Sequence, residues 1–373
     1  MNRLVYSIII ILISVATRTT DGFPGPYLCY YFGSAALTCN GRPVPVSNLP
    51  SECTSFIYDG IEIDRRVDTS GPNNGPPPPQ PNGSPDQFMF LDAVQQSDKD
   101  LLLCFYHAEN DKWRYDSEKI TMRAQQDAAF IKWYIAPRPK IKGLIFNDID
   151  FISYKANFPL FAQQFQLYLH YMRTAAKDFF IGIPVPAHFL IDEFSNPQST
   201  LKFATFDADV DFYMITFAIF NPCTAKLVKG GVIPYDSDDP EIKYTLKKLE
   251  VALKNSGIPS SKLYFKFQLF GISNRTGDLT FYSECFTSYE RICKYPDKTI
   301  SWCADNSGSL RIKGNFARNL GAGFVADSID LNDPVNSCHC KSPYSSFYYL
   351  IDGFKNQQTY PPCALFDRTS IPS

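Results

Sequence analysis

The stretch KGLIFNDIDFIS, which spans Lys142–Ser153, decides how the fold is interpreted. Apolar residues fill most of its positions, as in a parallel strand that is covered on both faces. It also carries two carboxylates, Asp148 and Asp150, which lie two residues apart and so share one face of such a strand. Buried charges are costly unless they are paired. The two acids are therefore either catalytic groups at the strand's end or hydrogen-bonded acids inside the fold.

Similar short apolar runs recur along the chain and alternate with segments of helical pattern. Eight such runs are expected to form strands: Tyr27–Phe32, Thr54–Ile63, Leu101–Tyr106, Ile141–Ile152, Phe179–Val185, Phe212–Phe220, Leu263–Phe270 and Ala322–Ile329. The helical segments between them are Ser117–Tyr134, Phe158–Thr174 and Glu241–Ser256. This alternation predicts an α/β fold, a single (β/α)8 TIM barrel. The segment Ser283–Lys313 is expected to be an elaborated loop region before the last strand.

The N-terminus has the pattern of a secretory signal peptide. Asn2 and Arg3 precede the apolar run Leu4–Val15, and a polar stretch then leads to Gly22. A retained membrane anchor is the alternative, but the run is short for a span of about 20 residues. We expect residues 1–22 to be removed and residues 23–373 to be a secreted, extracellular protein that is not held in a membrane. The net charge of −2 provides no electrostatic basis for binding nucleic acid.

Eleven cysteines are consistent with an oxidising compartment and disulfide bonds. Their odd number leaves at least one outside any intramolecular pair. No metal site is expected, because Cys338-His339-Cys340 is too tightly spaced for zinc and the chain has only four histidines. No other cofactor is predicted. Asn82 and Asn274 begin glycosylation sequons, although Pro85 weakens the first of them.

Two further segments stand apart from the barrel pattern. Residues 70–85 are rich in proline, glycine and asparagine and are expected to be a flexible surface loop after the second strand. A linker between domains is the rival interpretation, but the two strands that precede it are too few to form a domain. Residues 335–373 follow the last strand as a cysteine-containing extension.

With these strands in order, the chain resembles the chitinases and chitinase-like proteins of glycoside hydrolase family 18. The resemblance covers about Tyr27–Pro334. It is carried by the ordered series LCYYFG (28–33), CTSFIYDGIEID (53–64), DLLLCFYHAEND (100–111), SKLYFKFQLFG (261–271) and GAGFVADSIDLND (321–333). In the family a cysteine of the second strand commonly bridges back to the first. Because the two strands are also neighbours in a barrel, we predict a Cys29–Cys53 disulfide. Cys104, within the third strand, is predicted to be a buried thiol.

The resemblance gives the opening stretch a place in the family's fourth strand, which carries D-x-x-D-x-D-x-E. Aligned on DID, its positions are Ile145, Asp148, Asp150 and Ile152. In the family, the glutamate protonates the glycosidic oxygen, and the preceding aspartate orients the acetamido group of the substrate, which attacks the anomeric carbon. Ile152 has no proton to donate. Asp150 is two residues earlier and shorter, so it is not expected to reach the scissile oxygen.

Other positions of the family's site also differ. The sixth strand of the family ends in M-x-Y-D, where this chain has Thr216, Phe217 and Ala218. The tryptophan that forms the floor of the family's sugar site aligns with Asp327. Trp133 is expected in the core. The candidate ligand-binding residues at the barrel mouth are Tyr58, Tyr106, Trp113, Asp148, Asp150, Phe217 and Asp327.

Three functions from different classes therefore remain open. The first is a secreted, catalytically inactive chitinase-like protein that binds a glycan or a secreted or host protein, as a monomer. The second is an active family 18 type glycosidase that hydrolyses chitin or another N-acetylglucosamine-containing glycan with a relocated acid. The third is an interaction protein that has lost sugar binding. The missing acid disfavours the second, and the missing tryptophan weakens the case for a glycan ligand.

Overall fold

The computed structural model describes most of the chain between residues 24 and 368. The described residues are 24–33, 44–63, 80–81, 85–107, 120–147, 149, 151–152, 155–175, 178–196, 198–218, 220–228, 230–273, 288–294 and 302–368. Side chains are not described at 59–63, 80–81, 85–87, 105–107, 120–123 and 368. The expected signal peptide, most of the segment 70–85, and the sequon residues Asn82 and Asn274 lie outside these residues.

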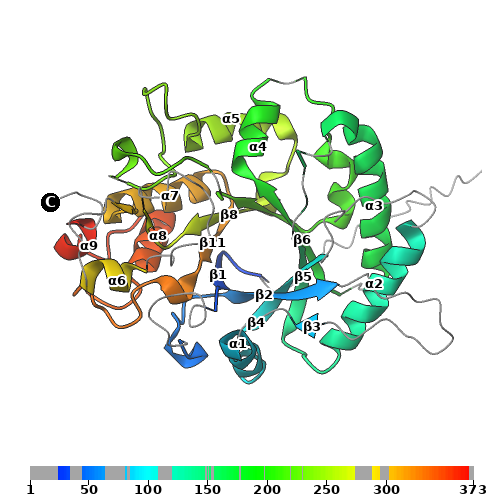
Figure 1. The fold of residues 1–373 in the computed structure, drawn as a ribbon, viewed down its shortest axis with the longest axis horizontal. Helices are drawn as coiled ribbons and strands as arrows, with labels where there is room; N and C mark the ends of the chain where they lie inside the picture. The colour runs from blue at the N-terminus through cyan, green and yellow to red at the C-terminus, as the bar shows by residue number, and fades with distance from the viewer. Residues whose placement is uncertain are drawn as a thin grey trace, which may run out of the picture.

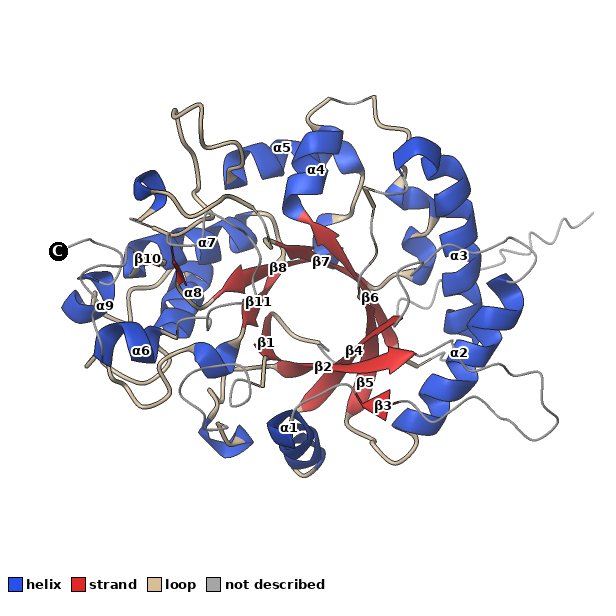
Figure 2. Cartoon of the chain, in the orientation of Figure 1, coloured by secondary structure: helices blue, strands red, loops and turns tan. Residues whose placement is uncertain are grey.

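Eight parallel strands form a closed barrel, which confirms the predicted (β/α)8 fold. Their spatial order is β1-β2-β4-β5-β6-β7-β8-β11, and the pairing of β1 with β11 closes the ring (Figure 2). The strands are β1 (Tyr27–Tyr31), β2 (Ser55–Ile63), β4 (Asp100–His107), β5 (Ile141–Phe146), β6 (Phe180–Pro186), β7 (Phe212–Thr216), β8 (Leu263–Gln268) and β11 (Gly323–Asp327). A short strand, β3 (Gln80–Pro81), pairs antiparallel with β2. The end of the segment expected to be a loop therefore joins the sheet.

Helices surround this barrel, as Figure 1 shows. They are α1 (Pro85–Gln95), α2 (Ile120–Ile135), α3 (Phe158–Ala175), α4 (Ala187–Phe194), α5 (Leu246–Ser256), α7 (Ser307–Asn319) and α8 (Ser345–Lys355). The predicted helix Glu241–Ser256 begins later, at Leu246, because Thr245 caps it by accepting a hydrogen bond from the Lys248 amide. Short 3-10 turns add to the connections, among them η1 (Val46–Asn48), η3 (Phe203–Thr205), η4 (Asp207–Asp209), η5 (Ala225–Leu227), η6 (Ser260–Lys262) and η8 (Ile329–Leu331).

The predicted loop region before β11 contains several small elements. They are α6 (Tyr289–Lys294), β10 (Trp302–Cys303) and the beginning of α7. The short strand β9 (Ile272–Ser273) precedes this region. Strand β10 pairs antiparallel with β9 outside the barrel. The C-terminal extension contributes α8, which packs against α7 in the helical ring, and the short helix α9 (Ala364–Arg368).

The apolar side chains form two cores because each strand is covered on both faces. The barrel interior contains Leu28, Tyr30, Ile57, Leu102, Cys104, Ile145, Phe212, Met214 and Val325. A much larger core lies between the strands and the surrounding helices. Neighbouring residues such as Ile57 and Tyr58 belong to different cores, as the alternation of side chains along a strand requires.

Strand β5 is shorter than predicted, and this changes the interpretation of the opening stretch. We expected Ile141–Ile152, but the strand ends at Phe146. A turn follows in which Ile149 and Phe151 are buried, at 6% and 1% exposure, whereas Ile152 is 59% exposed. The ring of Phe151 stacks on Phe189 of α4, which explains why an apolar residue follows the strand without extending it.

Four disulfides join described cysteines. The predicted Cys29–Cys53 bridge is confirmed, with a Cα–Cα distance of 5.7 Å across neighbouring strands. The other three are Cys223–Cys303, Cys293–Cys338 and Cys340–Cys363. Cys104 is a buried thiol inside the barrel and takes part in no disulfide, as predicted.

Two features hold α7 against its surroundings. The buried Lys313 ammonium donates hydrogen bonds to both carboxylate oxygens of Asp305, at 2.6 and 2.5 Å. One residue further along, Gly314 lies against the backbone of Leu350 on α8, and Gly353 of α8 lies against the backbone of Arg311. The absence of side chains at these two glycines lets the helices approach closely.

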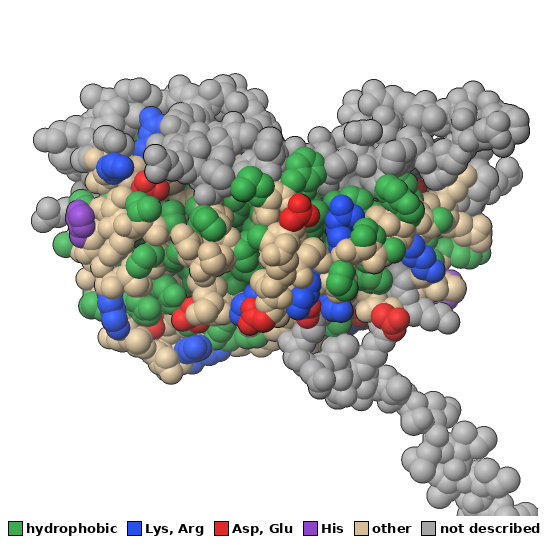
Figure 3. Space-filling view, turned by 90° about the horizontal axis from the view of Figure 1, so that it is seen from below, with side chains coloured by type: hydrophobic (Ala, Val, Ile, Leu, Met, Phe, Trp, Pro, Cys, Tyr) green, Lys and Arg blue, Asp and Glu red, His purple; other side chains and the backbone are tan. Residues whose placement is uncertain are grey.

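Charges of both signs are mixed on the face of the molecule that Figure 3 shows, which is seen from below the view of Figure 1. Figure 3 shows that acidic and basic side chains are interspersed there among hydrophobic and polar ones. This agrees with the net charge of −2. In the described part of the chain, no helix combines the length and the apolar character that crossing a bilayer requires.

Candidate functional site

The carboxyl ends of the barrel strands form the mouth where (β/α)8 proteins place their sites. Three neighbouring strands, β8, β11 and β1, contribute polar or aromatic side chains there. The Lys266 ammonium lies 3.2 Å from a carboxylate oxygen of Asp327. It also lies 3.6 Å from the centre of the Tyr30 ring. Both charged side chains are mostly buried, so this ion pair is poorly screened by solvent.

Strand β11 leads into a strained turn that positions this pair. Ser328 adopts a left-handed conformation with φ 58°, which is uncommon for a residue other than glycine. Its hydroxyl donates a hydrogen bond of 3.2 Å to Asp327. Two residues later, the buried Asp330 accepts hydrogen bonds from the amides of Phe32 and Gly33, at 2.8 and 3.0 Å. The acidic exit of β11 thereby fixes the end of β1.

Apolar side chains line the interior faces of β4, β5 and β7. Cys104 of β4, Ile145 of β5 and Met214 of β7 are buried in the interior core. A tight approach between strands is visible at Gly143, where an added Cβ would overlap the side chain of Leu102. Within the described interior, the Lys266–Asp327 ion pair therefore lies among mostly apolar side chains.

A second polar group lies beyond β6, at the beginning of α4. The Tyr244 hydroxyl donates a hydrogen bond of 2.8 Å to Asp192, and the Lys243 ammonium donates one of 2.6 Å to the Tyr244 oxygen. His188 packs edge-on against the Tyr244 ring. Burial lowers the pKa of His188 below its ordinary value, so its imidazole is neutral at pH 7. This group can accept and donate hydrogen bonds, but only Lys243 and Asp192 carry charge.

The structure separates the predicted site residues. Asp327 lies at the mouth, as described above. Tyr58 and Phe217 were predicted at the mouth, but both are buried in the outer core, which corrects the prediction. Tyr58 lies against Phe90 of α1, and Phe217 lies against Phe267. Both residues point outward because their strand neighbours point inward. Asp148, Asp150, Trp113 and the side chain of Tyr106 lie outside the described residues.

Two residues show what the sequence interpretation missed. Trp133 was expected in the core but is 62% exposed on α2. The amphipathic pattern of α2 places it one position beyond Lys132, on the solvent side. Lys266 was not singled out, although it is the only charged residue in the apolar run LYFKFQLF, and such an interruption signals an inward-facing charge.

Comparison with known proteins finds likeness in structure rather than in sequence. No protein-family model matches the chain, and no curated protein sequence matches it significantly. Among solved structures, the second catalytic domain of a Group II chitinase from Ostrinia furnacalis, in complex with (NAG)5, has a TM-score of 0.66 at 15% identity. That alignment covers 91% of this chain and 99% of the other.

Two further neighbours show the range of functions that this fold supports. Human YKL-39, described as a pseudo-chitinase with retained chitooligosaccharide binding properties, has a TM-score of 0.63 at 15% identity. The alignment covers 88% of this chain and 99% of YKL-39. An immunomodulatory active chitinase from Trichuris suis has a TM-score of 0.59 at 16% identity, with 88% and 99% covered. The chain therefore has the fold shared by chitinases and a pseudo-chitinase, as the resemblance in its sequence predicted.

Proposed function

We propose that the chain is a secreted, catalytically inactive chitinase-like protein that binds a glycan or a protein partner at the barrel mouth. The observation that carries this proposal is that no carboxylate occupies the proton-donor position in either of two alignments of the family motif with β5. In that motif, D-x-D-x-E, the three acids alternate along one face of the fourth strand. In the sequence alignment its last position is Ile152, which is 59% exposed beyond the end of β5. An alignment that instead takes Ile145, whose side chain faces the barrel interior, as the first of these three acids ends at Ile149.

The second alignment lies three residues before the one inferred from the sequence pattern. Aligned on Ile145 as the second acid of the motif, its positions are Lys142, Ile145, Asn147 and Ile149. The earlier alignment ended at Ile152, which is exposed beyond the strand. An isoleucine occupies the position of the proton donor in both alignments. General acid catalysis contributes about 10²–10⁴-fold to rate, and neither isoleucine can supply it.

Secretion is supported by the four disulfides, because such bonds persist in oxidising compartments. The ligand class is constrained by the mouth. Asp327 stands where the family has its sugar-floor tryptophan, and its carboxylate is paired with Lys266. A ligand at this point meets charge and hydrogen-bonding groups rather than an indole face. This same observation favours the third function, an interaction protein that has lost sugar binding.

The purified chain is expected to show no turnover of a chromogenic chitobioside above the uncatalysed background. The variant Ile149→Glu is expected to remain inactive, because Lys142, Ile145 and Asn147 leave the rest of the motif without its carboxylates. Asp150→Ala serves as the matched control. Turnover by the unmodified chain that disappears in Asp150→Ala would show that the acid has been relocated, and would overturn the proposal.

Calorimetric titration with chitopentaose distinguishes the two ligand classes. If the mouth binds glycans, saturable heat is expected, and Lys266→Met should weaken it about tenfold or more by removing a charged donor. The matched control is Lys132→Met, on the solvent side of α2. The absence of saturable heat would count against a chitooligosaccharide ligand at the mouth and would favour the interaction protein that has lost sugar binding.

A further inference from the structure

The first β/α unit of the barrel differs from the others. Every other connection between barrel strands, and the segment after β11, contains an α-helix in the described residues. Between β1 and β2, the described residues contain only the 3-10 turn η1. Among the described residues, the outer faces of β1 and β2 around Tyr31 and Phe56 lie against η1 and the neighbouring helix α1.

A groove of about 610 Å³ lies at this place, bounded by η1, α1 and the outer faces of β1 and β2. We call it the α1 groove. Its size falls within the range of small-molecule sites. Its lining includes Tyr31, Val46, Phe56, Phe90, Ala93 and Lys99. It is on the outside of the barrel and separate from the mouth.

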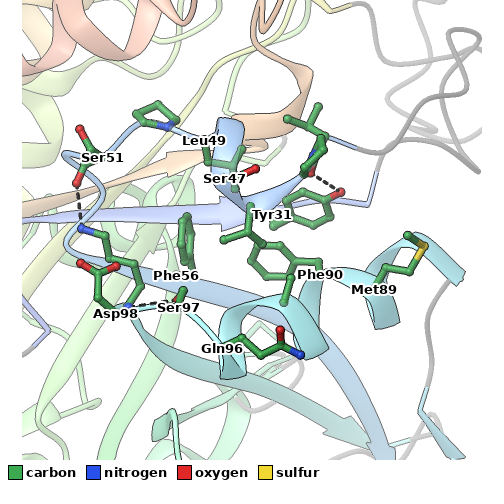
Figure 4. Close-up of a pocket in the computed structure, with 16 residues that line it drawn as sticks. Tyr31, Ser47, Leu49, Ser51, Phe56, Met89, Phe90, Gln96, Ser97 and Asp98 are labelled. Atoms are coloured by element: carbon green, nitrogen blue, oxygen red, sulfur yellow. Dashed lines mark hydrogen bonds between the residues drawn. The ribbon is translucent and has the colours of Figure 1, made fainter.

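Aromatic rings form the floor of the α1 groove. The Tyr31 ring stacks on Phe90 with centroids 4.0 Å apart, and Phe56 meets Phe90 edge-on at 5.5 Å. All three rings are buried, so they hold fixed positions. Figure 4 shows these rings between Ser51 and Asp98 at one end of the groove and the exposed Met89 at the other. The groove is therefore apolar along most of its length.

At the polar end, the Lys99 ammonium has hydrogen-bonding capacity left for a ligand. The Lys99 Nζ donates a hydrogen bond of 2.8 Å to the carbonyl oxygen of Ser51. Among the described residues it forms no ion pair, and the exposed Asp98 beside it is not within ion-pair distance. An ammonium has three N–H donors, so two remain for a ligand. The Ser97 hydroxyl is already used, because it donates to the Val94 carbonyl and accepts from the Lys99 amide.

We propose that the α1 groove binds an amphiphile with an apolar chain or ring and one anionic head group, such as a fatty acid. The apolar part lies along the accessible wall that Val46, Met89 and Ala93 form above the buried rings. The head group accepts hydrogen bonds from Lys99. Charge complementarity with Lys99 selects an anionic head over a neutral one, because hydrogen bonds to ionised groups are the stronger ones. The proposal for this site is independent of the barrel mouth and of any glycan ligand there.

Dodecanoate and its uncharged analogue dodecanol test the proposal by calorimetric titration of the full chain. Saturable dodecanoate binding is expected. Ala93→Trp, which fills the groove from α1, should weaken both ligands at least tenfold. Lys99→Met, which keeps the apolar stem, should weaken dodecanoate about tenfold and leave dodecanol unchanged.

Matched variants on α2 control for folding and for non-specific detergent effects. Ala129→Trp and Lys132→Met make the same substitutions at exposed positions away from the groove and should not change binding. Three results would overturn the proposal: no saturable binding by the unmodified chain, equal binding by Ala93→Trp and Ala129→Trp, or equal losses of acid and alcohol in Lys99→Met. A variant's melting temperature, measured beside each titration, identifies any loss that is due to unfolding.

Discussion

Replacement of Lys313 by methionine is expected to lower the free energy of unfolding by about 3–5 kcal/mol. Lys313 and Asp305 are both buried, and their ion pair has hydrogen bonds of 2.6 and 2.5 Å. Methionine matches the length of the lysine side chain, so the main effect is to leave the Asp305 carboxylate buried without its cation. Chemical unfolding at pH 7 with the disulfides intact measures the loss.

The double variant Lys313→Met/Asp305→Val is expected to recover most of that stability. Burial raises the pKa of Asp305 and lowers the pKa of Lys313, so the fold disfavours the charged form of each. Removing both charges therefore removes two desolvation penalties along with one attraction. A double variant that is as unstable as the single one would show that the ion pair itself contributes the stability.

The deficit of the single Lys313→Met variant is expected to shrink as the pH is lowered from 7 to 4. Burial raises the pKa of Asp305 above its ordinary value of 3.8 in the fold, and loss of Lys313 removes the charge that opposes this rise. A group whose pKa is raised in the fold contributes stability below its unfolded pKa, and that contribution is lost as the pH rises through the folded pKa. Unfolding curves at the two pH values, compared with those of the unmodified chain, measure the change. A deficit that does not change with pH would contradict this assignment.

Replacement of Gly314 by alanine is expected to destabilise the protein by about 1–3 kcal/mol or more. Helix propensity alone predicts the opposite sign, because alanine is favoured over glycine by about 1 kcal/mol within a helix. The added Cβ would overlap the carbonyl oxygen of Leu350 on α8, and backbone cannot move aside as a side chain can. The steric overlap with α8 therefore outweighs the gain in helix propensity. Thermal unfolding measures the change in stability.

Gly308, in the first turn of the same helix, provides the matched control. A Cβ there would lie 3.3 Å from the Asn306 side-chain oxygen and would meet no backbone. Gly308→Ala is therefore expected to be close to neutral. If the two variants were equally stable, the close contact between α7 and α8 would not be what requires glycine at position 314.

The barrel was predictable because each of its strands is a short apolar run, but the orientation of individual side chains was not. In a (β/α)8 barrel both faces of a strand are buried, so hydrophobicity does not distinguish Tyr58, which faces α1, from Ile57, which faces the interior. Phe217 was misplaced for the same reason. Only the register between strands resolves this, and register depends on contacts between distant segments.

The end of β5 was missed for a related reason. Ile149, Phe151 and Ile152 continue the apolar run beyond Phe146, and the sequence contains no glycine or proline there to mark the end. Burial of Phe151 against α4 is a tertiary contact with a segment nearly forty residues away. By contrast, the Cys29–Cys53 bridge was predictable, because β1 and β2 are neighbours in the barrel and Cys53, two residues before β2, lies close to Cys29 within β1.

The disulfides of the second half of the chain overlap in sequence, and this has a consequence for proteolysis. Cys223–Cys303 and Cys293–Cys338 enclose overlapping stretches, and Cys340–Cys363 encloses most of the remainder. A single cut of the backbone anywhere between Cys223 and Cys338, or between Cys340 and Cys363, leaves the two pieces covalently joined. A nicked molecule would thus migrate as one band in electrophoresis until a reductant is added, and it would keep its C-terminal helices through the cleavage.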